Sequence, residues 1–578
     1  MTRTVGAMHV AKISRRHGER EYVSHLVRRS IRDGRRVRHE TIANVSGLPA
    51  EAIAALTLAL QGVRLVPAGE AFEIVASRKH GHVEAVLGAA RRLGLARLLD
   101  REPSRERDLC MAMIAGRVLD GGSKLACTRQ LHSCTLGEEL GVQGAVHDDL
   151  YAAMDWLGER QQQIEQRLAR RHLKDGELAL YDVSSSYFEG HKCPLARFGY
   201  DHGTGKRGRM QVEYGLLCDS DGRPVAIEAF EGSLKDSKTL PSQVTKLERR
   251  FGLERVIVVS DRGIGTNENV TLISDTAAFG FITALKAPQI RKLVKEGALQ
   301  LSVFDELNLA EIACETLYPG QRLVVCRNPL IAHERARKRT ELLQSTEQDL
   351  SEITRRVQAG TLHGEAEIGL AVGAVINHYK MKKHFQVTIT DDTFTYERKH
   401  EQIALEAELD GLYVIRAGRI TEEELAAAAL VRAYKQLKDV EKAFHSFKGP
   451  LEVRPIHHHL EDRVRSHLLI CMLAEYVRWH LRHAWTELLF QDDTPRASTD
   501  PVAKATRSRE ATLRAGQRRT PAREPCHTIA SLFDELENRT RNTIRVTGTE
   551  ATFPQLSTPT ELQAHALQLI NEHVPQIT

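Results

Sequence analysis

The sequence predicts an α/β protein built around one mixed sheet, with helical regions before and after it. Between residues 177 and 286, short apolar runs alternate with helical patterns, which is typical of strands and helices packed in layers. Up to residue 174 and again after residue 528, apolar residues recur mainly at helical spacing. A chain of 578 residues is too long for one compact core, so we expect several domains.

Composition indicates a globular protein that stays in the cytoplasm. No run of about 18 apolar residues occurs, so no membrane span is expected. Residues 1–20 are basic and lack the apolar stretch of a signal peptide. The nine cysteines include no Cys-x-x-Cys pair, which favours reduced thiols over a structural zinc site.

The positive charge of the chain is unevenly placed. The formal net charge is only +5, yet residues 3–38 contain eleven Lys or Arg against three acids. Residues 504–523 are basic as well. Such clusters indicate contact with phosphate groups of nucleic acid, although a solvated surface is the alternative.

The N-terminal part is expected to contain a hairpin followed by helices. Residues 9–43 read as short strands around a turn at Asp33-Gly34, because Asp-Gly between apolar runs is a hairpin signal. From residue 49 to about 174 the pattern is helical, with polar breaks that divide it into several helices. This region is either a reader of nucleic acid or a scaffold, because no helix-turn-helix signature is clear.

The central part predicts strands and helices in a defined order. An antiparallel meander of three strands comes first, and a helix, a strand, a second helix and a further strand follow. The expected ranges are strands at 178–183, 211–218, 224–230, 255–261 and 280–285, and helices at 239–251 and 267–278. This order is that of an RNase H-like fold, apart from a missing last helix.

Residues 287–420 interrupt that order with short strands and a charged helix near 332–358. One long helix is expected from Glu422 to about Lys448, capped by Thr421 and Glu424. Another apolar helix is expected at about 461–490. Beyond it, polar residues poor in aromatics indicate a linker or disordered segment, and two helices are expected in the tail.

Two acids, Asp182 and Asp261, are expected at the carboxyl ends of two buried strands. Carboxylates in this position project into the open edge of an α/β sheet, where ligands usually bind. With a third acid from a following helix they could hold two divalent metal ions, and oxygen ligands select Mg²⁺ or Mn²⁺. Two such ions suit phosphodiester chemistry. The alternative is that Asp182 caps a turn and Asp261 caps the next helix.

Three separated motifs resemble those of DDE-type bacterial insertion-sequence transposases. Residues 256–263 resemble the second-Asp motif of that family, and residues 181–183 resemble the first. The third motif is a Tyr, an Arg three residues on, a Glu seven on and a Lys fourteen on. Tyr434, Glu441 and Lys448 match it, whereas Leu437 stands at the Arg position. The resemblance covers about residues 175–490.

The resemblance implies a transposase that binds the inverted ends of its element, cleaves the DNA and joins the 3′ ends to target DNA. It implies Asp182, Asp261 and Glu441 as ligands of two Mg²⁺ or Mn²⁺ ions, with double-stranded DNA as partner. It also implies a homodimer or larger assembly on DNA, in a bacterial cytoplasm near the nucleoid. The rivals are an RNase H-like nuclease without strand transfer and a catalytically silent, transposase-derived DNA-binding repressor.

Phosphate contacts are assigned to four residues. The resemblance gives Tyr434 and Lys448 this role. On one continuous helix, Tyr434, Glu441 and Lys448 would share a face, because positions seven apart drift by only about 20°. We expect Lys438 to replace part of the missing arginine while Leu437 turns to the core, with Arg262 as another source of charge. The alternative is that Lys438 pairs with Glu441 or another acid.

Several other residues receive structural interpretations. The interrupting segment of the family holds a Trp in some members, but this segment has none; Tyr318, Tyr379 and Tyr396 could stack on bases, or they pack in the fold. His457, His458 and His459 are expected in a loop and not at a metal. Ser184, Ser185 and Ser186 are expected to hydrogen-bond a turn.

These patterns divide the chain into seven segments. They are a basic hairpin segment (1–45), a helical and DNA-end-binding region (46–174), the first part of the RNase H-like core (175–286), a β-rich insertion domain with a charged helix (287–420), the second part of the core with Glu441 (421–492), a basic linker (493–527) and a helical tail that serves in dimerisation (528–578).

Overall fold

The computed structural model describes residues 4–18, 20–33, 36–63, 70–200, 207–276, 278–299, 308–490, 501–502, 506–520 and 523–577. Two compact units make up the chain: Met1–Arg78 with Thr540–Ser557, and Lys79–Arg539 with Thr558–Thr578. Among the described residues, no helix is both long and apolar enough to cross a membrane.

The first unit begins with an antiparallel three-stranded sheet. Its strands are β1 (Thr4–His17), β2 (Arg20–Asp33) and β3 (Arg36–Asn44), and α1 (Ala50–Leu60) follows. The hairpin expected around Asp33 is present, because Asp33 pairs with Arg36 across the turn; Gly34 itself lies outside the described residues. The strands are longer than the sequence suggested, and they leave few side chains buried.

A second sheet of this unit joins segments from opposite ends of the chain. β4 (Phe72–Lys79) pairs with β16 (Thr540–Val546), and β16 pairs with β17 (Thr552–Leu556). Both places differ from the expectation, which put only helices in residues 46–174 and in the tail. The reason is that β4 and β16 are stabilised as strands by each other, over a separation that a local pattern does not report.

The second unit has a helical part that surrounds α16 (Glu461–Ala484). Its N-terminal helices are α2 (Gly81–Arg92), α3 (Leu95–Leu99), α4 (Arg105–Leu119), α5 (Lys124–Ser133), α6 (Leu136–Glu139) and α7 (His147–His172). α2, α4 and α7 pack against α16, and so does α19 (Glu561–His573) from the tail. One buried apolar cluster extends from these helices into the sheet, so they share its core.

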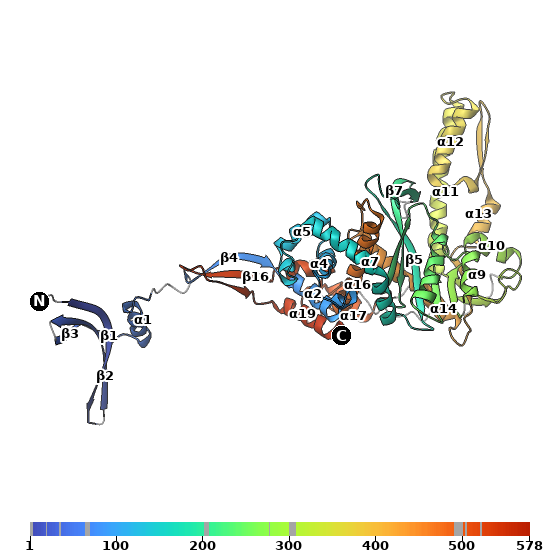
Figure 1. Cartoon of the computed structure of the whole chain (residues 1–578). Helices are drawn as coiled ribbons and strands as arrows, with labels where there is room; N and C mark the ends of the chain where they lie inside the picture. Colours follow the sequence, from blue (N-terminus) through green and yellow to red (C-terminus); the bar gives the residue numbers. More distant parts are fainter. Residues whose placement is uncertain are drawn as a thin grey trace. The chain divides into compact units, whose positions relative to one another are not determined.

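The mixed sheet lies beside this helical part (Figure 1). Its strands follow the order β11-β12-β15-β10-β9-β5-β7-β6, with β8 also paired to β7. β5 is parallel to β9 and β9 is parallel to β10, whereas β7 and β8 are antiparallel to their neighbours. The bounds are β5 (Leu178–Tyr187), β6 (Arg197–Tyr200), β7 (Arg207–Cys218), β8 (Pro224–Glu231), β9 (Ile257–Ser260), β10 (Gly280–Ala284), β11 (Leu309–Ile312), β12 (Gln321–Arg327) and β15 (Leu412–Gly418). The α/β class with a mixed sheet is therefore confirmed.

Segment 287–420 divides between this sheet and a projecting part. β11, β12 and β15 extend the sheet beyond β10. α11 (Pro329–Gln358), α12 (Glu365–Tyr379), β13 (Phe385–Ile389) and β14 (Phe394–Arg398) enclose a small apolar cluster of their own. Figure 1 shows α11 and α12 rising together away from the sheet. α13 (His400–Ala407) leads from this part back to β15.

The remaining helices lie around the sheet and in the tail. They are α8 (Leu240–Thr245), which continues as a π-helical turn to Arg250, α9 (Asn267–Asp275), α10 (Ala287–Lys295), α14 (Ala427–Lys435), α15 (Leu437–Lys448), α17 (Arg509–Gln517) and α18 (Ile529–Glu537). The region 493–527, expected to be a linker or disordered, thus contains α17 among its described residues.

We predict that a protein lacking residues 1–63 keeps the thermal unfolding transition of the second unit. The reason is that β1, β2 and β3 pair only with one another. A protein that starts at Asp175 should lose cooperative unfolding, because α2, α4 and α7 supply part of the shared core. Differential scanning calorimetry measures both variants. A normal transition in the shorter protein would show that the helices are not needed for the core.

Candidate functional site

The first two acids of the expected site occupy equivalent positions on neighbouring parallel strands. Tyr181 on β5 lies opposite Ser260 on β9. Asp182 and Asp261 are the next residues, so the register places them side by side at a strand spacing of about 4.8 Å. β5 does not end at Asp182, as the sequence suggested, because it continues to Tyr187 through pairing with β7 alone.

Asp182 lies in an electrostatic environment that disfavours its negative charge. Burial raises the pKa of Asp182 to about 7, against a hydrogen bond that its Oδ1 accepts from the Val183 N–H at 2.8 Å. The carboxylates of Asp261, Glu441 and Asp236 raise this pKa as well. Four acids therefore act on one another here, and a cation among them would relieve the repulsion.

Asp236 joins this group from the loop after β8. A Cβ added at Gly263 would lie 3.6 Å from Asp236 Oδ2 and 3.7 Å from Asp261 Oδ2, so both carboxylates face the same point. The N–H of Gly263 also donates to Asp261 Oδ2 at 3.3 Å. Asp236 was not assigned a role from the sequence, because it precedes a short 3₁₀ turn (Asp236–Lys238) and does not follow a strand directly.

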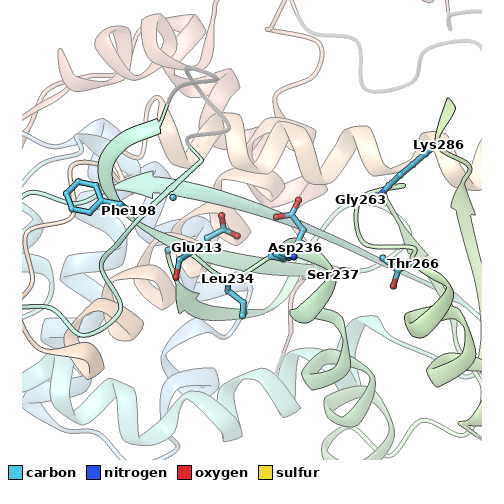
Figure 2. Close-up of a pocket in the computed structure, with 12 residues that line it drawn as sticks. Phe198, Glu213, Leu234, Asp236, Ser237, Gly263, Thr266 and Lys286 are labelled. Atoms are coloured by element: carbon cyan, nitrogen blue, oxygen red, sulfur yellow. The ribbon is translucent and has the colours of Figure 1, made fainter. Parts of the chain in front are cut away.

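An open cavity of about 780 Å³ begins beside these acids. Figure 2 shows Glu213 and Asp236 among its lining residues, with Gly263, Thr266 and Lys286 from the other wall. The cavity thus combines two carboxylates with at least one lysine. It is large enough to admit part of a polymer such as a nucleic acid strand.

Tyr434 reaches the same acids from α14. Its hydroxyl donates to Asp261 Oδ1 at 3.2 Å, and burial together with the Asp261 charge raises the pKa of Tyr434. The long helix expected from Glu422 to Lys448 is instead two helices, α14 and α15, separated at Gln436. Thr421 and Glu424 do exchange the expected capping hydrogen bonds, but α14 begins only at Ala427.

Glu441 approaches Asp182 from α15, which packs against β5. Its side chain is exposed, and its charge raises the pKa of Asp182. Because the helix breaks at Gln436, the alignment of Tyr434 with Glu441 comes from the packing of two helices and not from one helical repeat. Lys448 ends α15, two turns beyond Glu441.

Leu437 and Lys438 lie as the sequence suggested. Leu437 is buried at 7% exposure, as are Val440 and Phe444 on the same helix. Lys438 is exposed, and in the described part of the chain it forms no ion pair, with Glu441 or with any other acid. Its charge is therefore available to a ligand near Glu441.

Arg262 follows Asp261 directly and lines a second, basic cavity of about 600 Å³. This cavity lies between α10 of the sheet region and α11, and its cations are Arg262, Arg291, Arg335, Lys338, Arg339, Lys380 and Lys383. Its two acids are already engaged, because Asp410 pairs with Arg339, and Glu406 pairs with Lys383 and His384. An excess of positive charge therefore lies within one residue of Asp261.

The other tyrosines considered for stacking are held in the fold. Tyr318 is 5% exposed and lies under the guanidinium of Arg416, with 4.7 Å between the charge and the ring centre. Tyr379 donates to Asp349 at 3.0 Å, and Tyr396 donates to the Glu347 carbonyl oxygen at 3.3 Å. These contacts favour packing roles.

Two runs of polar residues are also located. His457, His458 and His459 lie in a loop, as expected. Ser184–Ser186 lie within β5 and not in a turn, because β5 is longer than the sequence suggested; the hydroxyl of Ser186 is 3.0 Å from that of Tyr214.

The donor set fits a hard divalent cation. Asp182, Asp261 and Glu441 offer only oxygen ligands, which Mg²⁺ and Mn²⁺ prefer. Within the described ranges, no three His, Cys, Asp or Glu side chains are close enough to form a complete metal-binding group. The mutual repulsion of the four acids supports a cation at this place, because a cation would offset both their charge and the burial of Asp182.

Comparisons with known proteins give no relative. No protein-family model matches the chain, and no curated protein is significantly similar to it.

We predict that millimolar Mg²⁺ raises the melting temperature of the protein at pH 8, because an ion bound among these acids stabilises the folded state. Asp261→Asn should lose most of this rise. Asp148→Asn removes a carboxylate with 82% exposure on α7 and should retain it. Differential scanning fluorimetry over a Mg²⁺ series measures the effect. An equal rise in Asp261→Asn and the unsubstituted protein would show that Mg²⁺ binds elsewhere.

Proposed function

We propose that the protein is a DDE transposase that binds the inverted ends of its insertion sequence, cleaves the DNA there and transfers the 3′ ends into target DNA. The observation that carries this proposal is the register of β5 and β9, which aligns Asp182 with Asp261. Glu441 adds a third carboxylate from a later helix. The order of these acids in the chain matches the three motifs that resemble this family.

The strand order supports an RNase H-like core. The order β8-β7-β5-β9-β10, with β5, β9 and β10 parallel and β7 antiparallel, is that of this fold. In such a sheet, acids at the carboxyl ends of the central parallel strands meet at one edge. β15, β12 and β11 extend the sheet on the side of β10, where the interrupting segment leaves and returns.

Asp182, Asp261 and Glu441 would hold two Mg²⁺ or Mn²⁺ ions, which supply an activated water or 3′ hydroxyl and stabilise the leaving oxygen of the phosphodiester. The hydroxyl of Tyr434 holds Asp261 Oδ1 in place. Asp236 adds negative charge at the same point and orients toward Gly263. The protein's own contribution is thus a rigid set of carboxylates, positioned before the DNA arrives.

Double-stranded DNA is the proposed partner, and cations beside the acids would hold its backbone. Arg262 and the basic cavity would contact phosphates on one side of Asp261. Lys438 and Lys448 on α15 would contact them near Glu441, while Tyr434 acts mainly through Asp261. A dimer or larger assembly in the bacterial cytoplasm would pair two element ends.

We predict that Asp182→Ala, Asp261→Ala and Glu441→Ala each abolish cleavage of end-containing DNA in Mg²⁺ while DNA binding persists. Each substitution removes a metal ligand and leaves the basic surfaces unchanged. Cleavage on gels and binding by gel shift are measured together, with Asp148→Ala as the control. Cleavage at the normal rate by any of the three would remove that residue from the site. Cleavage without strand-transfer products would favour the nuclease, and binding without cleavage by the unsubstituted protein would favour the repressor.

We predict that Lys438→Ala slows cleavage and lowers the salt dependence of DNA binding, because one phosphate contact is lost. The slope of log K against log salt should fall by about 0.9. Lys442→Ala is the matched control, because Lys442 lies on the same helix but is paired with Asp439 at 2.7 Å. Leu437→Arg should not improve cleavage, because it places a charge in the core. An unchanged rate and slope for Lys438→Ala would exclude the role of Lys438.

A further inference from the structure

A small cavity lies where α4 ends and α5 begins, in the helical part of the second unit. It has a volume of about 10 Å³, which is room for one water-sized group. The chain around it reads Gly121-Gly122-Ser123-Lys124, and Lys124 is the first residue of α5. Arg117 from the last turn of α4 lines the cavity too. Figure 1 shows α4 and α5 together at this place.

Lys124 is a buried cation that lacks an anionic partner. It is 5% exposed and lines the cavity. In the described part of the chain, its ammonium group has neither an ion pair nor a hydrogen bond with a side chain or carbonyl group. Burial lowers the pKa of Lys124 to about 8, and the charge of Arg117 lowers it too. A buried charge without a partner is strongly unfavourable, so this arrangement calls for an anion.

The surroundings of Lys124 add positive charge and supply no carboxylate. Arg117 is 6% exposed and donates to the carbonyl oxygens of Leu451 and Glu452 at 3.2 and 3.3 Å. Lys124 and Arg117 both lower the pKa of His458, after the larger effect of burial. The remaining groups that act on Lys124 are the thiols of Cys110, Cys127 and Cys471. The thiols of Cys110, Cys127 and Cys471 all have raised pKa values because they are buried, and so they stay neutral.

The backbone at this place is also suited to an anion. The first turn of a helix presents N–H groups without intrahelical acceptors, and the helix dipole favours negative charge there. Ser123 caps α5 by accepting a hydrogen bond from the Ala126 N–H at 3.1 Å, and the earlier N–H groups of the turn remain. Gly122 has φ of +125°, which a side chain would strain, so the loop can bend close to the helix.

We propose that this cavity is an anion-binding site that takes one oxygen of a phosphate group, held by Lys124 and by the N-terminus of α5. The cavity admits one oxygen, so the rest of the phosphate stays at its mouth. That geometry suits a phosphodiester of DNA as well as free phosphate. The DNA source rests on the proposed function, whereas the site itself does not. It would place one backbone contact in the helical region, apart from the acids.

The first experiment uses inorganic phosphate with the full-length protein. Phosphate should raise the melting temperature above that in potassium gluconate of equal ionic strength. Lys124→Met keeps the length and apolar stem of the side chain, removes the charge and should lose this rise. Arg129→Met removes an exposed cation on the same helix and should keep it. An equal rise in Lys124→Met, or no rise in the unsubstituted protein, would overturn the site. If Lys124→Met does not fold, Lys124→Gln takes its place.

The second experiment decides the source of the phosphate. Binding of duplex DNA is measured over a salt series, and Lys124→Met should lower the slope of log K against log salt by about 0.9. Lys174→Met is the control, because Lys174 is exposed and lies near Glu177. A lost phosphate effect with an unchanged slope would support the site and overturn the DNA source. A lowered slope without DNA cleavage would support both, even if the proposed catalytic function failed.

Discussion

The parallel pairing of β5 with β9 is the constraint on which the candidate site depends. It holds Asp182 and Asp261 at the same level of two adjacent strands, where burial and like charge oppose ionisation of Asp182. An arrangement of this kind is unfavourable for the fold by itself. It is kept in place by the buried apolar residues of both strands and by the hydroxyl of Tyr434 on Asp261. The same repulsion is what makes a divalent cation a fitting ligand.

Positive charge surrounds these acids at a short remove, and this combination suits a polyanionic substrate. Carboxylates alone would repel a DNA backbone, whereas Arg262 and the basic cavity beside it would attract the strand. Lys438, exposed on α15, adds a charge near Glu441. The acids and the cations come from different elements, so their spacing depends on how α10, α11 and α15 pack against the sheet.

The helical region and the sheet are joined by a buried ionic network as well as by apolar contacts. Glu165 on α7 is fully buried and accepts hydrogen bonds from Arg250 Nη1 at 3.1 Å and from the Ile227 N–H on β8 at 3.2 Å. Lys246 Nζ lies 3.7 Å from the same carboxylate. Removal of one partner would leave a buried charge uncompensated, so these residues couple the helices to the core. The proposed phosphate site at Lys124 is therefore on a part of the molecule that is rigidly connected to the acids.

The sequence by itself determined the elements whose signal is local. The hairpin around Asp33, the order of strands and helices between residues 178 and 285, and the acid after β9 all follow from short apolar runs and turn residues. Only the tertiary structure decided the pairing of β4 with β16, the extension of the sheet by β11, β12 and β15, and the break at Gln436. The approach of Asp236 to Asp261 belongs to the same group. These features depend on contacts between residues far apart in the chain, and their energies come from burial and pairing that a local pattern does not contain.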